Sequence, residues 1–297
     1  MIHQDHQMKI FTKALVYSRM IKLSHTIFAL PFALAAVVLV HRISPIDMRT
    51  VFWILMAMAG ARSAAMGFNR LVDACIDAKN PRTASRAIPA GAISRSEAAA
   101  FIISSSLLFL LSAAMLSPLC LWLSFPVLAV MFAYSYTKRF TWLNHVVLGF
   151  AIGMAPMAVW VAVTGKISGD IAVLSLALIT YIAGFDILYA CQDAEFDRKE
   201  GLYSIPSRFG IAPAMRVSEL LHGISVISLL ALYWLFSLSP AYLVFVGIIA
   251  VLFVIEHKLV NPHDLSKIDM AFFHVNSIIS ALVFVAVLSG EALRGVI

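Results

Sequence analysis

The sequence predicts an all-α integral membrane protein, a bundle of nine transmembrane helices around a central cavity that opens at the cytoplasmic side. Of the 297 residues, 61% are hydrophobic and 13% are charged, and the mean hydropathy is +0.91, far above that of soluble domains. The apolar residues fall into runs long enough to cross a bilayer as helices. Lys and Arg concentrate in alternate loops between these runs, as expected for a multi-pass membrane protein.

Along the chain, one N-terminal segment is followed by one bundle, so we expect a single domain over residues 1–297. Residues 1–22 are polar and then basic, which predicts either an interfacial helix or a simple cytoplasmic anchor. The nine-helix bundle is expected over residues 24–289. Its predicted spans lie near residues 24–41, 50–69, 97–117, 119–136, 144–164, 171–190, 215–237, 240–257 and 270–289.

The distribution of basic residues predicts the orientation of the bundle. The net charge of +6 would suit a nucleic-acid partner, but most of the 22 Lys and Arg lie in the N-terminal segment and in every second loop. This pattern indicates a lipid bilayer and no nucleic acid. We therefore expect an inner (cytoplasmic) membrane protein with its N-terminus and its acidic motifs on the cytoplasmic side and its C-terminus on the opposite side.

Local signals support individual elements. Ser94 and Glu97 form a capping-box pattern at the start of the third span. Gly149 and Gly153 form a small-x-x-x-small pair in the fifth span, which favours close contact with another helix. The three cysteines have neither a disulfide framework nor the spacing of metal ligands.

The first acidic motif lies at the end of the second span. Asn69, Asp73 and Asp77 follow one another at intervals of four residues. On a helix each is rotated only about 40° from the one before, so one helix face carries an amide and two carboxylates. We call these three residues the first acidic ladder.

The second acidic motif lies at the end of the sixth span. Asp186, Asp193 and Asp197 fall within about 20° of one stripe if the helix is continuous. Two acidic ladders at the mouth of an apolar bundle suit Mg²⁺ bound to a pyrophosphate, because this hard cation takes carboxylate oxygens, waters and substrate phosphates. Cationic side chains that follow the acids add charge-assisted hydrogen bonds to phosphate: Arg82, Arg86, Lys138, Arg139, Arg198, Lys199 and Arg208.

The two ladders resemble the UbiA superfamily of intramembrane aromatic prenyltransferases, which carries the motifs N-x-x-x-D-x-x-x-D and D-x-x-Y-x-x-x-D-x-x-x-D. The resemblance covers nearly the whole chain. Its further elements are Arg62, N-P-R-T from Asn80, P-A-G from Pro89, Y-S-Y-T-K-R from Tyr134, G-L-Y-S-I-P-S-R-F-G from Gly201 and, more weakly, A-F-F-H-V-N from Ala271.

The resemblance implies a Mg²⁺-dependent enzyme of quinone biosynthesis that transfers a polyprenyl group from polyprenyl diphosphate to the ring of an aromatic acid. Its expected acceptor is 4-hydroxybenzoate, as in ubiquinone biosynthesis. A dihydroxynaphthoate, as in menaquinone biosynthesis, is the close alternative, and residue spacing does not separate the two. An ion-coupled secondary transporter is the alternative from another class, although transport sites usually lie near the midplane of the membrane.

The resemblance also implies roles for individual residues. Those expected to bind Mg²⁺, the aspartates among them being catalytic, are Asn69, Asp73, Asp77, Asp193 and Asp197. Those expected to bind diphosphate are Lys138, Arg139, Arg82, Arg208 and Lys22. Those expected to contact the acceptor are Arg62, Asp186, Tyr189 and Asn276.

Two of these roles have structural alternatives. Arg62 lies within a span, where a charge is costly and indicates function. It is expected either to bind the carboxylate of the acceptor or to form a buried ion pair with Asp186. Asn276 either lines the cavity or makes one hydrogen bond between helices.

The chain departs from the family pattern at two positions beside the first acidic ladder. Ala74 stands where many relatives have Arg, which puts a supporting ion pair in doubt. Arg70 stands where an Asp is common, which favours naphthoate-using relatives.

Overall fold

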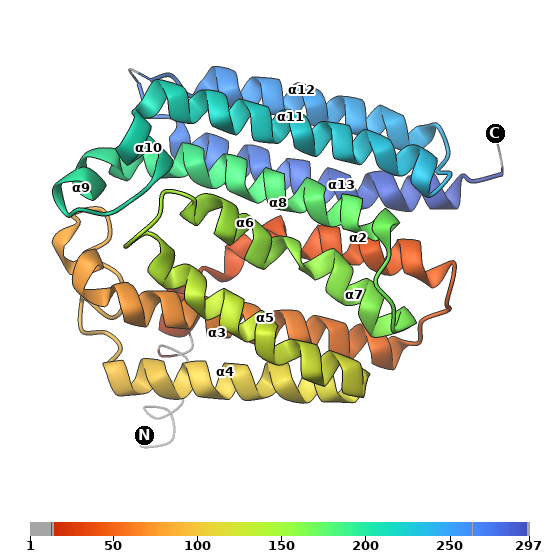
Figure 1. The fold of residues 1–297 in the computed structure, drawn as a ribbon, viewed down its shortest axis with the longest axis horizontal. Coiled ribbons are helices and arrows are strands. Elements are labelled where there is room, and N and C mark those ends of the chain that lie inside the picture. The colour runs from red at the N-terminus through yellow and green to blue at the C-terminus, as the bar shows by residue number, and fades with distance from the viewer. Residues whose placement is uncertain (1–12, 14, 263, 296–297) are drawn as a thin grey trace, which may run out of the picture.

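The computed structural model describes residues 13, 15–262 and 264–295, and the part it describes is helical without a β-strand (Figure 1). This confirms the predicted all-α fold. In chain order, the elements are η1 (Leu23–Phe28), α2 (Leu30–His41), α3 (Met48–Lys79), α4 (Arg95–Leu116), α5 (Pro118–Thr137), α6 (Asn144–Gly153), α7 (Ala155–Thr164), α8 (Gly169–Ala190), η2 (Cys191–Asp193), α9 (Ala194–Lys199), α10 (Ile205–Phe209), α11 (Ile211–Leu235), α12 (Ala241–Leu259), η3 (Met270–Val275) and α13 (Asn276–Ala292).

Eight helical segments of the described chain are long and apolar enough to cross a membrane. The remaining predicted span, near 24–41, is a shorter apolar helix formed by η1 and α2. The predicted fifth span is divided into α6 and α7, because Pro156 at the start of α7 has no N–H to donate to the preceding turn. The predicted interfacial segment lies mostly outside the described residues, but residues 15–20 are helical.

The helix α8 forms the centre of the bundle. In the segment Gly169–Lys199, 72% of the apolar stretch is buried, whereas only 17% is buried in α5. Aliphatic and aromatic side chains of α8, such as Leu174, Leu178 and Tyr181, form the main hydrophobic core with residues of α2, α11, α12 and α13. The helices around α8 instead leave one apolar face outward, toward the lipid.

The predicted contact of Gly149 and Gly153 is confirmed, and its partner is α8. A Cβ atom at Gly149 would lie 2.4 Å from the backbone oxygen of Ile179, and one at Gly153 would lie 2.2 Å from Cγ1 of the same residue. The absence of side chains therefore lets α6 pack directly on the backbone of α8. This close approach matters for the site, because α6 and α8 each supply a polar residue to it.

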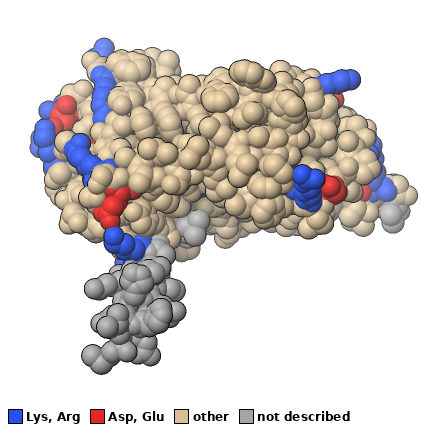
Figure 2. All heavy atoms as spheres, turned by 90° about the horizontal axis from the view of Figure 1, so that it is seen from below, with Lys and Arg blue, Asp and Glu red and all other residues tan. Residues whose placement is uncertain are grey.

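Charged residues gather at the two ends of the molecule, with a broad apolar belt between them (Figure 2). One end holds the C-terminal end of α3, the loop after it, and the short helices α9 and α10 (Figure 1). The last described residues of the chain lie at the other end (Figure 1). The protein is therefore a multi-pass membrane protein whose acidic motifs lie at one end of the bundle.

Candidate active site

The first acidic ladder lies on one continuous helix, because α3 runs ten residues beyond the predicted end of its span. The helix α3 begins after its N-cap residue Asp47, whose side chain accepts a hydrogen bond from the backbone N–H of Thr50. Asn69 Nδ2 donates to Asp73 Oδ2 at 3.0 Å, as their spacing of four residues allows. Asp73 and Asp77 are 2% and 4% exposed, so both carboxylates are buried in the bundle.

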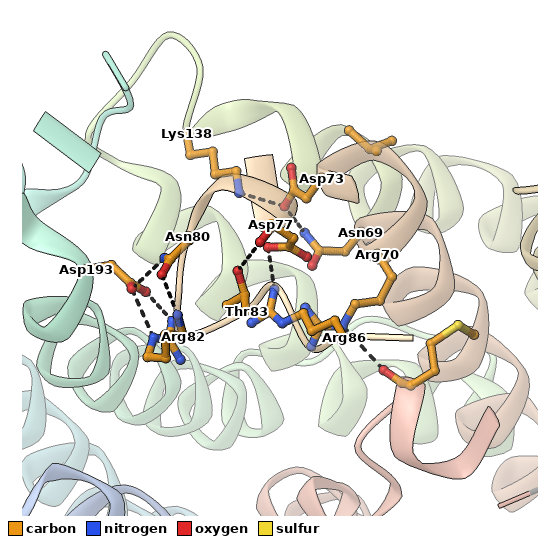
Figure 3. A network of polar contacts seen from close by, with 12 residues as sticks. Asn69, Arg70, Asp73, Asp77, Asn80, Arg82, Thr83, Arg86, Lys138 and Asp193 are labelled. Carbon is orange, nitrogen blue, oxygen red and sulfur yellow. Dashed lines mark hydrogen bonds and ion pairs between the residues drawn. The ribbon is translucent and has the colours of Figure 1, made fainter. Parts of the chain in front are cut away.

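Two cations that directly follow α5 hold Asp73. Lys138 Nζ lies 2.7 Å from Asp73 Oδ2 (Figure 3). Arg139 Nη2 lies 3.0 Å from Oδ1 of the same side chain. Arg139 is fixed in turn by the carbonyl oxygen of Ser135, to which it donates at 2.6 Å. Both oxygens of Asp73 are therefore satisfied by charge-assisted contacts.

Asp77 is only half satisfied. Arg86 Nη1 donates to Asp77 Oδ1 at 2.7 Å, and the Thr83 hydroxyl donates to the backbone oxygen of Asp77 at 3.0 Å (Figure 3). The other carboxylate oxygen, Oδ2, is buried and has no hydrogen-bond partner within the described chain. A buried carboxylate oxygen without a partner costs about 1–3 kcal/mol, so this position favours a ligand that supplies a donor or a cation.

The second acidic motif does not lie on one continuous helix. The α-helix α8 ends at Ala190, and the 3-10 turn η2 precedes α9. The predicted single stripe of Asp186, Asp193 and Asp197 is therefore wrong, because a 3-10 turn advances the chain by a larger angle per residue. Asp186 stays on α8, whereas Asp193 and Asp197 lie on the segments beyond it.

The loop after α3 reaches across to Asp193 (Figure 3). Arg82 donates from Nε to Asp193 Oδ1 at 2.9 Å and from Nη2 to Oδ2, a bidentate pair. Asn80 Nδ2 donates to the same Oδ1 at 2.9 Å. The two acidic motifs are therefore joined through the N-P-R-T loop, and this loop brings them to one place.

Asp186 is paired with a histidine. His145 Nδ1 lies 2.7 Å from Asp186 Oδ2, and His145 is 2% exposed. The alternative in which Arg62 forms a buried pair with Asp186 is therefore wrong. Arg62 instead donates from Nη2 to the backbone oxygen atoms of Lys22, at 3.0 Å, and Ile21, at 3.4 Å. Its buried Nε has no hydrogen-bond partner among the described residues.

Tyr189 lies between two cations. Arg82 Nη1 donates to the Tyr189 hydroxyl at 2.7 Å, and the guanidinium carbon lies 4.9 Å from the ring centroid. Lys22 Nζ lies 5.4 Å from the same centroid. These positions fit cation–π contacts, in which a ring face attracts positive charge. An aromatic ring therefore borders the cationic part of the site.

Lys22 lies near three arginines. Burial, and then the charges of Arg70, Arg86 and Arg82, lower the pKa of the Lys22 ammonium from 10.5 to about 8, and the opposing charge of Asp269 does not offset them. Lys22 is thus an unfavourable cation in the protein alone, and an anion placed among these four residues would relieve the repulsion. At Arg82 burial also disfavours the charge, but the hydrogen bond and charge of Asp193 outweigh it and raise the pKa of the guanidinium.

Three predicted site residues lie outside this network. Arg208 is exposed on α10 and forms no ion pair within the described residues. Asn276 is fully buried, and its Nδ2 donates to Glu256 Oε1 at 2.6 Å, a contact between α12 and α13. Asp197 interacts electrostatically with Asp193 and Lys138, so it lies near the network without belonging to it.

Asn80 and His145 belong to the network but are not among the predicted site residues, and Arg86 was expected only as one of the cations near the phosphate. Asn80 donates to Asp193, and Arg86 donates to Asp77. Both residues lie in the loop that follows the first acidic ladder, and this position could have identified them from the sequence. His145 has no such signal, because a single histidine at the start of a span usually has a structural role. Its pairing with Asp186 depends on the packing of α6 against α8.

The chemistry of the site suits a magnesium ion together with an anion. Carboxylate and amide oxygens are the protein ligands that Mg²⁺ prefers, and Asp77 Oδ2 is one such oxygen without a partner. Among the described residues, no three His, Cys, Asp or Glu side chains form a cluster that would enclose a metal. A magnesium ion here would therefore take further oxygen ligands from a bound phosphate ester, whose charge the cations would neutralise.

A helical membrane bundle with carboxylates and cations converging at one end suits an intramembrane enzyme that acts on phosphate esters. Residues 29–278 match the UbiA prenyltransferase family, and the chain belongs to this family. It is a prenyltransferase, as the sequence motifs predicted.

Curated relatives carry a more specific name. The 4-hydroxybenzoate octaprenyltransferase of Citrobacter koseri is 33% identical over 233 residues, which cover 75% of this chain and 78% of that protein. The protein of the same name from Methylobacillus flagellatus is 28% identical over 233 residues, which cover 78% of each chain.

Solved structures show the same fold. A UbiA homologue from Aeropyrum pernix K1 has a TM-score of 0.77 at 29% identity and covers 91% of this chain and 97% of that one. A UbiA homologue from Archaeoglobus fulgidus, bound to GPP and Mg²⁺, has a TM-score of 0.70 at 20% identity, with coverage of 92% and 99%. At that identity the similarity to the second protein shows the fold alone.

Proposed function

We propose that the protein transfers a polyprenyl group from a polyprenyl diphosphate to the ring of 4-hydroxybenzoate, with Mg²⁺ as cofactor, in ubiquinone biosynthesis. The observation that carries this proposal is the convergence of carboxylates and cations from three parts of the chain at one end of the bundle. The names of the relatives from Citrobacter koseri and Methylobacillus flagellatus support the benzoate over the naphthoate.

In this proposal the ladder residues hold Mg²⁺ and the surrounding cations hold the diphosphate. The metal ligands are Asn69, Asp73, Asp77, Asp193 and Asp197, either directly or through water. When bound, Mg²⁺ would act as a Lewis acid that neutralises the departing diphosphate. The GPP and Mg²⁺ bound to the Archaeoglobus fulgidus homologue support this pairing.

The cations would change partners when the substrate binds. Lys138, Arg139 and Arg82 are held by carboxylates in the protein alone. Once those carboxylates face Mg²⁺, the same side chains can donate to the diphosphate, and Lys22 lies among them as a further cation. Arg208 remains a candidate that would have to turn from the surface to take part.

The aromatic acceptor would lie deeper than the diphosphate. Arg62 is two helical turns inward of Asn69 on α3, and its unpartnered Nε is a free donor for the carboxylate of the acceptor. Tyr189 lies near this region, because Lys22, to whose carbonyl oxygen Arg62 donates, has its Nζ 5.4 Å from the Tyr189 ring centroid. Asp186 lies about one helical turn from Tyr189 on α8. Asn276 remains an acceptor candidate only if α12 and α13 separate. The ring of Tyr189 would shield an allylic cation from water and stabilise its charge.

We further propose that residues 1–297 act as one domain, and that the site faces the cytoplasm with the C-terminus on the opposite side. The C-terminal end of α3 and the helix α9, which carry most of the two acidic motifs, lie at one end of the bundle (Figure 1). The Lys and Arg side chains that contact these acids lie there too, and the positive-inside rule favours the cytoplasm for that end. A water-soluble acceptor and Mg²⁺ are available there.

The test is product formation by the purified protein in liposomes that contain a polyprenyl diphosphate, with 4-hydroxybenzoate and Mg²⁺ added. Mass spectrometry of the lipid extract is expected to show the prenylated hydroxybenzoate, and Asp73→Ala and Asp193→Ala are expected to abolish it. Product from a dihydroxynaphthoate but not from 4-hydroxybenzoate would refute the proposed acceptor. Ion flux across the liposomes without prenyl transfer would instead support a transporter.

A further inference from the structure

Asp186 differs from the other acids of the site in the partner that holds it. Asp73, Asp77 and Asp193 each face Lys or Arg side chains, which carry full positive charges. Asp186 Oδ2 instead lies 2.7 Å from Nδ1 of His145. A histidine can hold a carboxylate as a neutral donor, and then it orients the acid without cancelling its charge.

The backbone fixes which nitrogen of His145 carries the proton. The N–H of Ile205, at the start of α10, points at His145 Nε2 across 3.4 Å. A backbone N–H can only donate, so Nε2 is the acceptor and the ring proton lies on Nδ1. In this tautomer the Nδ1–H of His145 donates to Asp186 Oδ2.

His145 is also held in place by its surroundings. It is 2% exposed at the N-terminal end of α6, where α6 packs against α8 through Gly149. The Ser204 side chain caps α10 by accepting from the backbone N–H of Ser207, so the N–H of Ile205 is presented from an ordered turn. The imidazole is therefore a rigid support rather than a mobile group.

The second oxygen of Asp186 remains available. No contact to Asp186 Oδ1 is found within the described chain, and this oxygen is not a buried unpartnered atom, because a quarter of the side chain is exposed. The carboxylates of Asp186 and Asp73 both interact electrostatically with the hydroxyl of Tyr134. Asp186 therefore faces the same region as the first acidic ladder.

A charged carboxylate with one free oxygen selects its ligand by chemistry. It accepts a hydrogen bond from a hydroxyl group and repels a carboxylate. We propose that His145 is a positioning residue that fixes Asp186 so that Asp186 Oδ1 accepts a hydrogen bond from the phenolic hydroxyl of the aromatic acceptor. This inference rests on the proposed function and assigns the hydroxyl end of the acceptor to the His145–Asp186 pair.

The inference predicts a selective loss when the donor on His145 is removed. In His145→Gln the side-chain amide reaches the place of Nε2 and leaves Asp186 without its donor, whereas in His145→Asn the amide nitrogen takes the place of Nδ1. A hydrogen bond to a charged group contributes about 1.5–3 kcal/mol, so we expect the KM for 4-hydroxybenzoate to rise about 10- to 100-fold in His145→Gln. We expect most of this loss to be recovered in His145→Asn.

Two further measurements separate positioning from a general structural defect. Benzoate has the carboxylate but not the hydroxyl, so its inhibition constant is expected to stay within about twofold in His145→Gln. The KM for the polyprenyl diphosphate is also expected to stay within about twofold. Asp186→Asn is expected to give the same selective loss, and the double variant with His145→Gln is expected to be no worse than either single variant.

The outcomes distinguish this inference from the proposed function. A wild-type protein that forms no prenylated hydroxybenzoate overturns the proposed function. If the wild type forms product and His145→Gln leaves the KM for 4-hydroxybenzoate unchanged, the positioning role of His145 is overturned alone. The same conclusion follows if the constants for benzoate, 4-hydroxybenzoate and the diphosphate all rise together. If His145→Gln fails to fold, Asp186→Asn provides the same comparison, and an equal rise in the constants for benzoate and 4-hydroxybenzoate in that variant overturns the inference.

Discussion

Replacing Asp77 with asparagine should separate the stability of the protein from its requirement for magnesium. In the protein alone, Asp77 Oδ1 accepts from Arg86 at 2.7 Å and Oδ2 is buried without a partner. Asparagine keeps an oxygen for Arg86 and loses the negative charge. The weaker contact with Arg86 is offset because a buried anion with one unsatisfied oxygen disappears. We therefore expect little change in the unfolding temperature without metal.

The magnesium requirement should change much more. The unsatisfied Oδ2 costs about 1–3 kcal/mol in the protein alone, and a magnesium ion that takes this oxygen as a ligand recovers that free energy. The variant cannot recover it, because its amide nitrogen is no ligand for Mg²⁺. This free energy corresponds to a factor of about 5 to 150 in the dissociation constant for Mg²⁺. The Mg²⁺ concentration for half-maximal activity should therefore rise by one to two orders of magnitude.

The assay is a Mg²⁺ titration of product formation at a fixed concentration of polyprenyl diphosphate. Thermal unfolding is measured in parallel with a chelator present. Glu200→Gln is the matched control, because it also removes one negative charge at this end of the bundle, from an exposed pair with Lys79. If Asp77→Asn and Glu200→Gln require the same Mg²⁺ concentration, Asp77 is not a metal ligand and the reasoning fails.

Three other substitutions test separate parts of the site and fold. Because the Lys22 ammonium loses its proton as the pH rises through about 8, kcat/KM for the polyprenyl diphosphate should fall above that pH, and Lys22→Arg should remove the fall. Arg62→Ala should raise the KM for 4-hydroxybenzoate about 10- to 100-fold through the loss of a charge-assisted contact, and an unchanged KM would exclude its contact with the carboxylate. Gly149→Ala should cost about 1–3 kcal/mol of stability because its Cβ would lie 2.4 Å from the backbone oxygen of Ile179; Gly247→Ala, with open space around it, is the control in thermal unfolding.

Local periodicity accounts for the parts of the structure that the sequence could predict. The spacing of Asn69, Asp73 and Asp77 placed one polar face on a helix, and α3 carries that face. The same reasoning failed at Asp193, because the turn η2 interrupts the helix without a Pro or Gly to signal it. Helical spacing holds only while the hydrogen-bond pattern stays regular.

The ion pairs between different helices could not be predicted from the sequence, for a different reason. Arg82 and Asp193 are 111 residues apart in the chain, and His145 and Asp186 are 41 apart. Several cations near each acid satisfy the same rule of opposite charge, and the choice among them depends on which helices pack together. Arg62 was thus a reasonable partner for Asp186 by charge, but the contact of α6 with α8 supplies His145 instead.

The arrangement of charges explains how one site can be stable in the protein alone and still bind a highly charged substrate. Unpaired carboxylates and ammonium groups would be costly at the end of a membrane bundle, so Asp73 and Asp193 are held by Lys138 and Arg82. In the proposed function Mg²⁺ takes the place of the Lys or Arg beside each carboxylate, and the diphosphate takes the place of the carboxylate beside each Lys or Arg. Each side chain therefore exchanges one partner for another of the same sign, and binding does not have to create new ion pairs from unpaired charges. Binding of Mg²⁺ is most favoured at Asp77 Oδ2, because this buried oxygen has no hydrogen-bond partner to give up within the described chain.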